Sequence, residues 1–233
     1  MRIKTMLAAA TLVLFAAASY AEKPPENWDG LVEVKAKSLD VAYLAPGADF
    51  RPYTRIMVDP TEVAFNKDWM KNMNDRRDVS RMVTDEKAQE ILTAARTNFN
   101  DIFNEAFTKA GYTVATAPGP DVLRVRAGVI NLYINAPDVM AAGRSKSYTA
   151  NAGEATLVIE ARDSMSGALL SRVLDRRETR EMAGMMQTTS VTNVADFRSL
   201  FKSWASIATK GLDRLKAASP IPTTLTPGQK VGK

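Results

Sequence analysis

The clearest hydrophobic pattern in the chain lies between residues 85 and 110, where apolar side chains recur at steps of three and four positions. Such spacing collects them on one face of an α-helix. Thr84 is a suitable N-cap, and Asp85 and Glu86 suit the positive end of the helix dipole. Gly111 stands where a helix commonly ends. The pattern predicts a helix over 85–110 whose apolar stripe belongs to the core, the alternative being an exposed groove for a partner.

A second helical stripe follows a cap at Thr192 or Asn193 and ends before Ser219, where a proline-rich segment begins. Its spacing again places the apolar residues on one face. These residues are Phe197, Leu200, Phe201, Trp204, Ala205, Ile207, Ala208, Leu212 and Leu215. The polar residues 66–84 predict a short helix or an irregular connection.

Several shorter segments are bounded by turn residues, and the clearest of them alternate between apolar and polar side chains, as strands do. They cover residues 39–45, 53–58 with a possible extension over 62–65, 112–117, 122–135, 154–162 and 168–176. The last two predict a β-hairpin, because Gly167 in the connection between them suits a positive φ. Residues 136–153 and 178–192 are expected to be long loops.

The order of these elements predicts an α+β fold. We expect a single domain over 38–217, with two long amphipathic helices packed on one face of a mostly antiparallel sheet. Residues 22–37 are polar and contain prolines, so they predict a flexible lead. Residues 218–233 predict a disordered C-terminal tail, because so little apolar surface cannot offset the entropy lost on ordering.

The N-terminal pattern is that of a secretory signal. Arg2 and Lys4 precede an uncharged apolar run over residues 6–18, and small residues then occupy positions 19 and 21. The run is shorter than the roughly 20 residues that a membrane-spanning helix needs. This favours a signal peptide over 1–21, cleaved between Ala21 and Glu22, over an uncleaved membrane anchor. We therefore expect a periplasmic protein with no later membrane span.

The residues that the chain lacks exclude several kinds of chemistry. It has no cysteine, so it can carry neither a disulfide nor a lipid on an N-terminal cysteine, and we expect it not to be lipid-anchored. It has no histidine either, which excludes a Ser-His-Asp triad and a conventional zinc site. The net charge is +5, and +3 once residues 1–21 are removed, without a basic stripe interleaved with aromatics. We expect no nucleic-acid partner and no cofactor.

Four charged residues form the strongest candidate for a site. Glu160, Arg162 and Asp163 lie at one end of the predicted hairpin, with Asp175 on its return strand. Neighbouring carboxylates can do acid–base work if burial separates their pKa values. The favoured alternative is structural, with Asp163 bonded to the turn backbone and Glu160 paired with Arg162 on a solvent face.

Two predicted loops carry weaker candidates. Met182, Met185 and Met186 offer thioethers, which are ligands for Cu(I), although methionine more often serves as adaptable packing. The loop over 136–153 contains Arg144, Lys146 and Tyr148, and could bind a partner or simply be mobile.

Three segments together resemble a known family. They are residues 160–170 (EARDSMSGALL) with Asp175 beyond them, residues 43–50 (YLAPGADF) followed by Tyr53, and the closing helix with Phe197, Trp204 and Ala205. Over residues 38–217 the chain resembles the domain of unknown function family 3313, bacterial envelope proteins of which many are lipoproteins. The resemblance implies an envelope location and no established activity. The missing lipid-bearing cysteine sets this chain apart from such relatives.

Three hypotheses about function follow. The first is a non-enzymatic envelope component that binds another envelope protein, in an oligomeric state that the sequence does not indicate. The second is a periplasmic binder of a small ligand or lipid, which requires an apolar pocket between sheet and helices. The third is a hydrolase that uses carboxylates.

Overall fold

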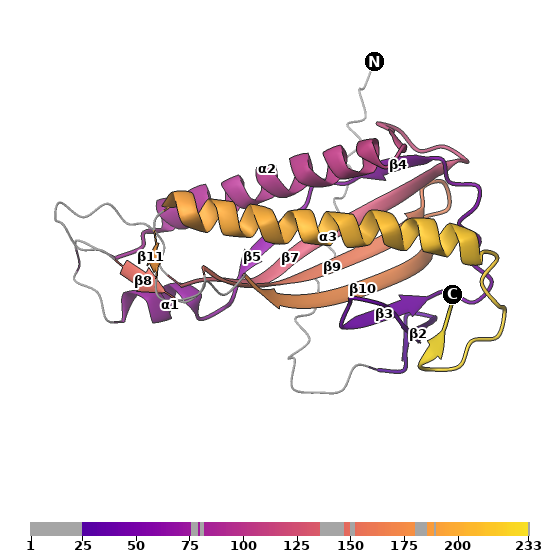
Figure 1. Cartoon of the computed structure of the whole chain (residues 1–233), viewed down its shortest axis with the longest axis horizontal. Coiled ribbons are helices and arrows are strands. Elements are labelled where there is room, and N and C mark those ends of the chain that lie inside the picture. The colour runs from indigo at the N-terminus through magenta and orange to yellow at the C-terminus, as the bar shows by residue number, and fades with distance from the viewer. Residues whose placement is uncertain are drawn as a thin grey trace, which may run out of the picture.

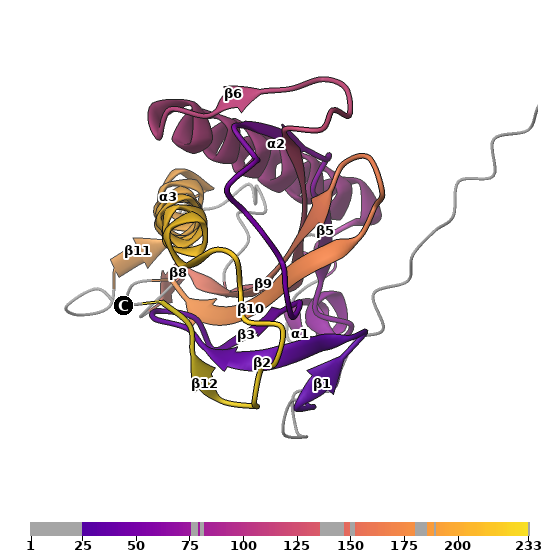
Figure 2. The same ribbon diagram turned by 90° about the vertical axis from the view of Figure 1, so that its right-hand side faces the viewer.

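In the computed structural model, two long helices lie along the concave side of a curved sheet (Figures 1 and 2). The structure describes residues 25–75, 79, 82–135, 147–149, 152–179, 186–188 and 190–232. Helix α2 spans Asp85–Lys109 and helix α3 spans Ser190–Ala218, while α1 is a short helix over Trp69–Asn74.

Within the described residues, the main sheet has ten strands. Their order is β1-β2-β3-β10-β9-β7-β4-β6, with β12 beside β2 and β5 beside β7. The strands are β1 Asn27–Trp28, β2 Leu31–Lys35, β3 Val41–Leu44, β4 Arg55–Val58, β5 Glu62–Phe65, β6 Thr113–Val114, β7 Val122–Ile134, β9 Gly153–Asp163, β10 Leu169–Glu178 and β12 Gln229–Lys230. The pairings from β1 through β7 in this order are antiparallel, whereas β4, β5, β6 and β12 pair in parallel. The prediction of a mostly antiparallel sheet in a mixed fold is confirmed.

The local sequence explains where α2 begins and ends. The hydroxyl of Thr84 accepts a hydrogen bond from the backbone N–H of Lys87 at 3.3 Å, which satisfies one of the first free donors of the helix. The helix stops at Lys109, and Gly111 then adopts a φ of +91°, which an L-residue with a side chain rarely takes.

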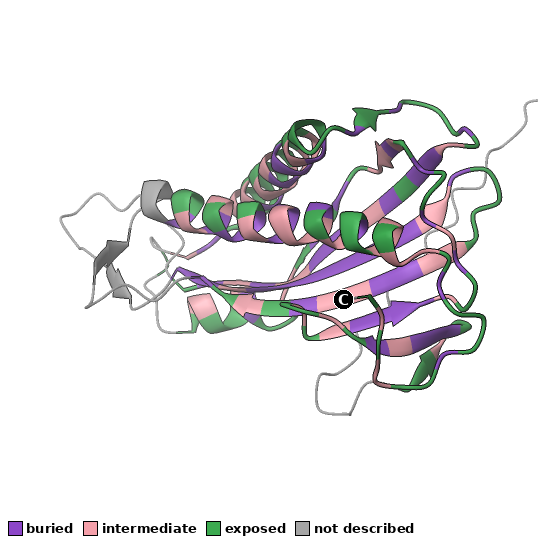
Figure 3. Cartoon of the chain, turned by 45° about the vertical axis from the view of Figure 1, so that its right-hand side comes forward, coloured by how far each residue is buried: buried purple, intermediate pink, exposed green. Residues whose placement is uncertain are grey.

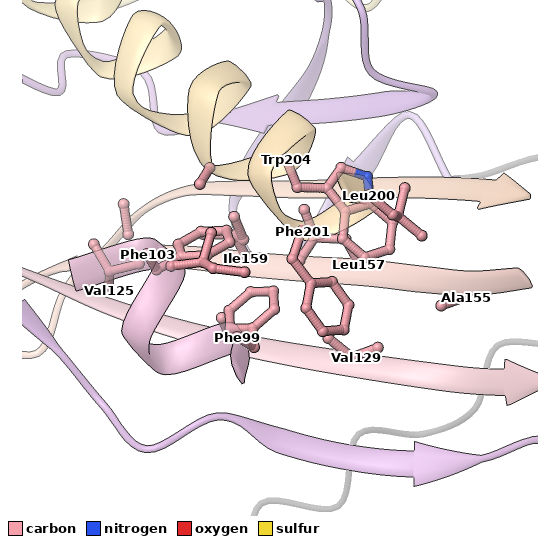
Figure 4. Packing of buried hydrophobic residues seen from close by; sticks show 14 of the residues in the cluster. Phe99, Phe103, Val125, Val129, Ala155, Leu157, Ile159, Leu200, Phe201 and Trp204 are labelled. Atoms are coloured by element: carbon pink, nitrogen blue, oxygen red, sulfur yellow. The ribbon is translucent and has the colours of Figure 1, made fainter. Parts of the chain in front are cut away.

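The core lies between the two helices and the sheet. Phe99 and Phe103 of α2 stack with ring centroids 4.0 Å apart, and Phe201 of α3 meets Phe99 edge-on at 5.3 Å. Val129 of β7 and Leu157 of β9 pack in the same cluster (Figure 4). Figure 3 shows the buried residues along the strands, with exposed residues on the outer sides of the helices. The apolar stripes of the two helices therefore meet each other above the sheet.

Two predictions about the chain ends need correction. Residues 31–35, assigned to a flexible lead over 22–37, form β2, because Leu31, Val32 and Val34 are buried against the rest of the fold. Residues 219–232, assigned to a disordered tail over 218–233, pack along the sheet edge. Ile221 and Leu225 are buried there, and strand β12 pairs with β2. Those two side chains and the paired backbone offset the entropy that polar composition alone would leave uncompensated.

The long loops predicted over 136–153 and 178–192 also contain regular structure. Strands β8 (Ser147–Thr149) and β11 (Met186–Thr188) pair with each other as a separate two-stranded sheet. Helix α3 begins at Ser190, before the predicted cap at Thr192 or Asn193. Short strands of three residues carry too little periodicity to be read from sequence.

A glycine inside α3 provides a test of this arrangement. A Cβ built on Gly211 would meet no other atom within 4 Å, and glycine is a poor helix former. Replacing Gly211 with alanine is expected to raise the free energy of unfolding by about 0.5–1 kcal/mol. Urea denaturation followed by circular dichroism measures the change, and a loss of stability would contradict the open space beside Gly211.

Candidate functional site

Glu160 lies in β9 and is buried between two arginines. Its Oε1 accepts hydrogen bonds from Nε and Nη2 of Arg172 at 2.9 and 2.6 Å. Its Oε2 accepts hydrogen bonds from Nε and Nη2 of Arg162 at 3.0 and 2.8 Å. Both carboxylate oxygens are therefore occupied by charge-assisted bonds, the strong kind of hydrogen bond.

The β1–β2 hairpin covers this pair. Cζ of the Arg172 guanidinium lies 4.1 Å from the centroid of the Trp28 ring, and its Nη2 lies 2.8 Å from Oδ2 of Asp29. We call Trp28, Asp29, Glu160, Arg162 and Arg172 the Glu160 cluster. Because four of its five members carry charge and Glu160 and Arg172 are buried, the cluster fixes how the hairpin sits on the sheet.

The electrostatics of the cluster keep Glu160 ionised. Burial by itself would raise the pKa of this carboxyl group, but the hydrogen bonds from Arg172 and Arg162 outweigh burial and hold its pKa below the ordinary value. A carboxylate held in this way is a poor general acid, since it does not take up a proton near neutral pH.

Asp163 serves the hairpin turn. Its Oδ1 accepts hydrogen bonds from the backbone N–H groups of Ser166 at 2.7 Å and Met165 at 3.1 Å. Its Oδ2 accepts the hydroxyl of Tyr53 at 2.9 Å. The backbone hydrogen bond from Ser166 is the main cause that lowers the pKa of Asp163. The structure thus shows the turn contacts that the structural alternative describes.

Asp175 anchors α3 to the sheet. Its Oδ2 accepts hydrogen bonds from Nε1 of Trp204 at 2.7 Å and from Nε of Arg177 at 2.6 Å. Its Oδ1 accepts the backbone N–H of Asp40 at 3.2 Å. Asp175 stands opposite Leu157 in the strand register and so shares the core face of the sheet.

The structure does not bring these candidates together as an acid–base pair. Side chains alternate along β9, so Ile159 faces the core whereas Glu160 faces the other side of the sheet. Glu160 and Asp175 are therefore on opposite faces. The structural alternative placed Glu160 on a solvent face, and this part is wrong. Glu160 is only 3% exposed. Arg172 and the hairpin cover it.

A different feature is open to a ligand. A pocket of about 260 Å³ lies between α2, α3 and the end of β7. We call it the α2–α3 pocket, and it is lined by Lys87, Glu90, Ile91, Ala94, Ala95, Asn98, Leu132, Ile134, Asn193, Val194, Phe197, Arg198 and Phe201. A smaller hollow of about 90 Å³ lies between α3 and the sheet among core residues.

The α2–α3 pocket has apolar walls and a polar rim. Ile91, Leu132, Ile134, Phe197 and Phe201 supply aliphatic and aromatic surface from all three elements. Charged and amide side chains stand among them at the helix surfaces. This combination of an apolar cavity with a few polar groups is typical of sites that bind small molecules.

Two side chains join the helices beside this pocket. Nη1 of Arg198 on α3 donates a hydrogen bond to Oδ1 of Asn98 on α2. On the other part of the rim, Nζ of Lys87 pairs with Oε2 of Glu90 at 3.2 Å. All four residues of these contacts line the pocket.

The remaining sequence predictions concern residues that the structure does not describe. The signal peptide over 1–21, its cleavage site at Ala21 and Glu22, and the side chains of Arg144 and Lys146 lie outside the described residues, as do Met182 and Met185. The structure describes the backbone of Met186 in β11 and the backbone of Tyr148 in β8. The Cu(I) and loop-binding hypotheses remain predictions.

The described part of the chain has no cluster of three or more acidic, histidine or cysteine residues that could hold a metal ion. In the same residues, none of the helices combines the length and the apolar character needed to cross a bilayer.

The family of the chain follows from a match along most of its length. The profile of the family described as "Protein of unknown function (DUF3313)" matches residues 23–207. The chain belongs to this family. The resemblance inferred from its hairpin, loop and helix segments is thereby confirmed. The matched residues of the DUF3313 protein also include β1 and β2. No curated protein matches the sequence.

Solved structures give more distant likenesses. The DUF3313 protein is similar to the PelC dodecamer from Paraburkholderia phytofirmans at 11% identity and a TM-score of 0.37, over 71% of this chain and 95% of that one. It is similar to a minor lipoprotein from Acinetobacter baumannii at 7% identity and a TM-score of 0.32, over 68% and 94% of the two chains. A DUF330 protein from Xanthomonas campestris gives 12% identity and a TM-score of 0.36, over 72% and 90%. These values are too low for properties of those proteins to be transferred to the DUF3313 protein.

Sequence reasoning found Glu160 and Arg162 of the Glu160 cluster, but it missed the other members of that cluster and the α2–α3 pocket. Ile91 and Phe197 were assigned to the core by their helical spacing, which cannot separate a filled interior from a pocket wall. Arg198 gave no signal, because one arginine on a helix most often lies in solvent. The contacts of Trp28 and Asp29 with this cluster were missed because both residues lie in the segment assigned to a flexible lead.

Proposed function

We propose that the DUF3313 protein is a non-enzymatic periplasmic protein that binds a small apolar ligand in the α2–α3 pocket. The observation that carries the proposal is the pocket itself, an apolar cavity of about 260 Å³ whose rim bears polar groups from two helices. Among the three hypotheses from the sequence, the ligand binder is the one that requires such a pocket.

The arrangement of carboxylates supports a binding role over a catalytic one. Glu160, Asp163 and Asp175 each accept several hydrogen bonds, and Glu160 and Asp175 face opposite sides of the sheet. None of the three lines the α2–α3 pocket. The three carboxylates hold arginines, a turn and a helix in place, and this structural role accounts for their positions without a catalytic one.

The periplasmic part of the proposal rests on the N-terminal sequence pattern. A positive start, a short apolar run and small residues before Glu22 are the parts of a cleavable signal. The absence of cysteine supports release of the protein without a lipid anchor. Binding of another envelope protein stays a prediction from the sequence, since no surface within the described residues favours it specifically.

Filling the pocket tests the proposal. Ala95 lines the pocket on α2, and leucine is a good helix former of larger volume. Replacing Ala95 with leucine is expected to weaken binding of the neutral fluorescent probe phenylnaphthylamine at least about tenfold, which is about 1.4 kcal/mol. Fluorescence titration of the purified protein measures this.

The matched control is Thr97→Leu, which adds the same side chain to an exposed position of α2 outside the pocket. It should leave probe binding within about twofold of the original protein. Equal loss in both variants, or absence of saturable binding to the original protein, would refute the pocket as a ligand site.

A further inference from the structure

The rim of the α2–α3 pocket has two cations, Lys87 and Arg198, and one of them is paired with a carboxylate. Lys87 pairs with Glu90 across one helical turn, with 3.2 Å between Nζ and Oε2. Arg198 donates to the neutral amide oxygen of Asn98. Among the described residues it has no carboxylate within ion-pair distance, and its charge reaches Glu105 of α2 only at longer range. Since a guanidinium group has five N–H donors, the bond to Asn98 leaves others for a ligand.

The start of α3 adds positive potential beside the same pocket. Asn193 and Val194 line the pocket near the N-terminus of the helix, where free backbone N–H groups concentrate. The first turn of α3 contains no acidic residue, whereas the first turn of α2 contains Asp85 and Glu86. Acidic side chains therefore offset the dipole of α2 in its first turn, whereas the first turn of α3 supplies none.

The size of the pocket limits what can enter it. Sites for drug-sized ligands occupy roughly 300–1,000 Å³. The α2–α3 pocket, at about 260 Å³, falls just below that range. It suits one narrow chain better than the paired chains of a membrane phospholipid.

We propose that the ligand is a single-chain fatty acid, with its carboxylate against Arg198 and its alkyl chain among Leu132, Ile134 and Phe197. This inference rests on the proposed function and names the ligand class for the same pocket. The planar guanidinium group suits a carboxylate because it can offer two parallel N–H donors. The apolar walls from β7 and α3 remove the alkyl chain from water, which favours binding in proportion to the area buried.

Competition between two probes of equal chain length tests the headgroup. Decanoate and decanol have ten carbons each and differ at the head. Decanoate is expected to displace phenylnaphthylamine from the purified protein with about tenfold or greater advantage over decanol, the gain expected from a charge-assisted hydrogen bond. Lengthening the carboxylate from octanoate to decanoate is expected to tighten binding by about fourfold per methylene.

The variant Arg198→Gln should remove the advantage of decanoate over decanol. The control Lys202→Gln removes an equal charge one turn further along α3, at an exposed residue that does not line the pocket. It should keep the preference for decanoate.

The outcomes separate this inference from the proposed function. Equal displacement by decanoate and decanol, or a preference that survives Arg198→Gln, would overturn the fatty-acid inference and leave the apolar site in place. Failure of phenylnaphthylamine to bind the original protein would overturn both. Loss of the decanoate preference in Arg198→Gln alone, with Lys202→Gln unchanged, would establish the headgroup contact.

Discussion

Replacing Glu160 with glutamine is expected to lower the free energy of unfolding by about 3–5 kcal/mol, the cost of removing one partner from a buried ion pair. Glutamine keeps the shape of the side chain but not its charge. Among the described residues, Arg172, which is 6% exposed, would then retain only Asp29 as a counter-ion, and Arg162 would lose its carboxylate partner and keep its hydrogen bond to the Gly167 carbonyl. Thermal or urea denaturation of the purified variant measures the loss.

The control is Glu154→Gln on the same strand. Glu154 pairs with Arg176 at 2.6 Å, but Arg176 is about half exposed, with 49% of its side-chain surface accessible. Exposed pairs of this kind contribute roughly 0–1 kcal/mol, so this variant should unfold close to the original protein. A loss of similar size in both variants would contradict the special role of the Glu160 cluster.

The same ion pairs predict how the difference between the original protein and Glu160→Gln depends on pH. The pKa of Glu160 is lowered in the folded protein, so its contribution to stability is fully present above the ordinary glutamate pKa, near 4.5. It is lost as the pH falls from that value through the lower pKa of the folded state, because the unfolded chain then takes up a proton that the folded protein does not. The stability difference should therefore be constant near neutral pH and shrink in acid; a constant difference down to pH values well below 4.5 would contradict this.

Replacing Gly153 with alanine is expected to destabilise the fold by a comparable amount. A Cβ at this position would lie 1.9 Å from the backbone oxygen of Tyr133, and the glycine has a φ of +144°. The strained backbone costs about 1–3 kcal/mol. The collision costs about another 1–3 kcal/mol, because the partner atom is backbone in the paired strand β7 and cannot rotate away.

The control for Gly153→Ala is Gly167→Ala in the hairpin turn. Gly167 also has a positive φ, of +73°, but an added Cβ would meet no atom within 4 Å. This variant should lose only the roughly 1–2 kcal/mol of the left-handed conformation. If the two alanine variants unfold at the same denaturant concentration, this result would contradict the close approach of the β7 backbone to Gly153 of β9.

The parts of the fold that could be predicted from sequence are those whose signal is local. The helix at 85–109 follows from its spacing and its cap at Thr84, and the hairpin at 153–178 follows from alternation around Gly167. Strand β2 and the ordered segment with Ile221 could not be predicted from sequence. Their few apolar residues become buried only when distant parts of the chain pack together.

The candidate site shows the same limit at the level of single residues. Glu160 and Arg162 stand two positions apart, so their pairing on one strand face could be anticipated. The contact with Arg172 needed the register of β9 and β10, and that with Trp28 and Asp29 needed the position of the first hairpin. A pocket depends on the distance between packed helices, which no pattern along α2 or α3 records.

The pairing of β3 with β10 has a consequence for how the chain reaches this structure. It joins residues 41–44 to residues 171–174, so most of the chain lies between the two partners. Contacts of such long sequence separation make folding slow, because loop-closure entropy is lost before the contacts form. During the proposed export, β2 and β3 would leave the translocation channel early and keep an open edge until β10 follows. A chain stalled before that point would present this edge to proteases and to other chains, which makes complete transfer a condition for closing the sheet.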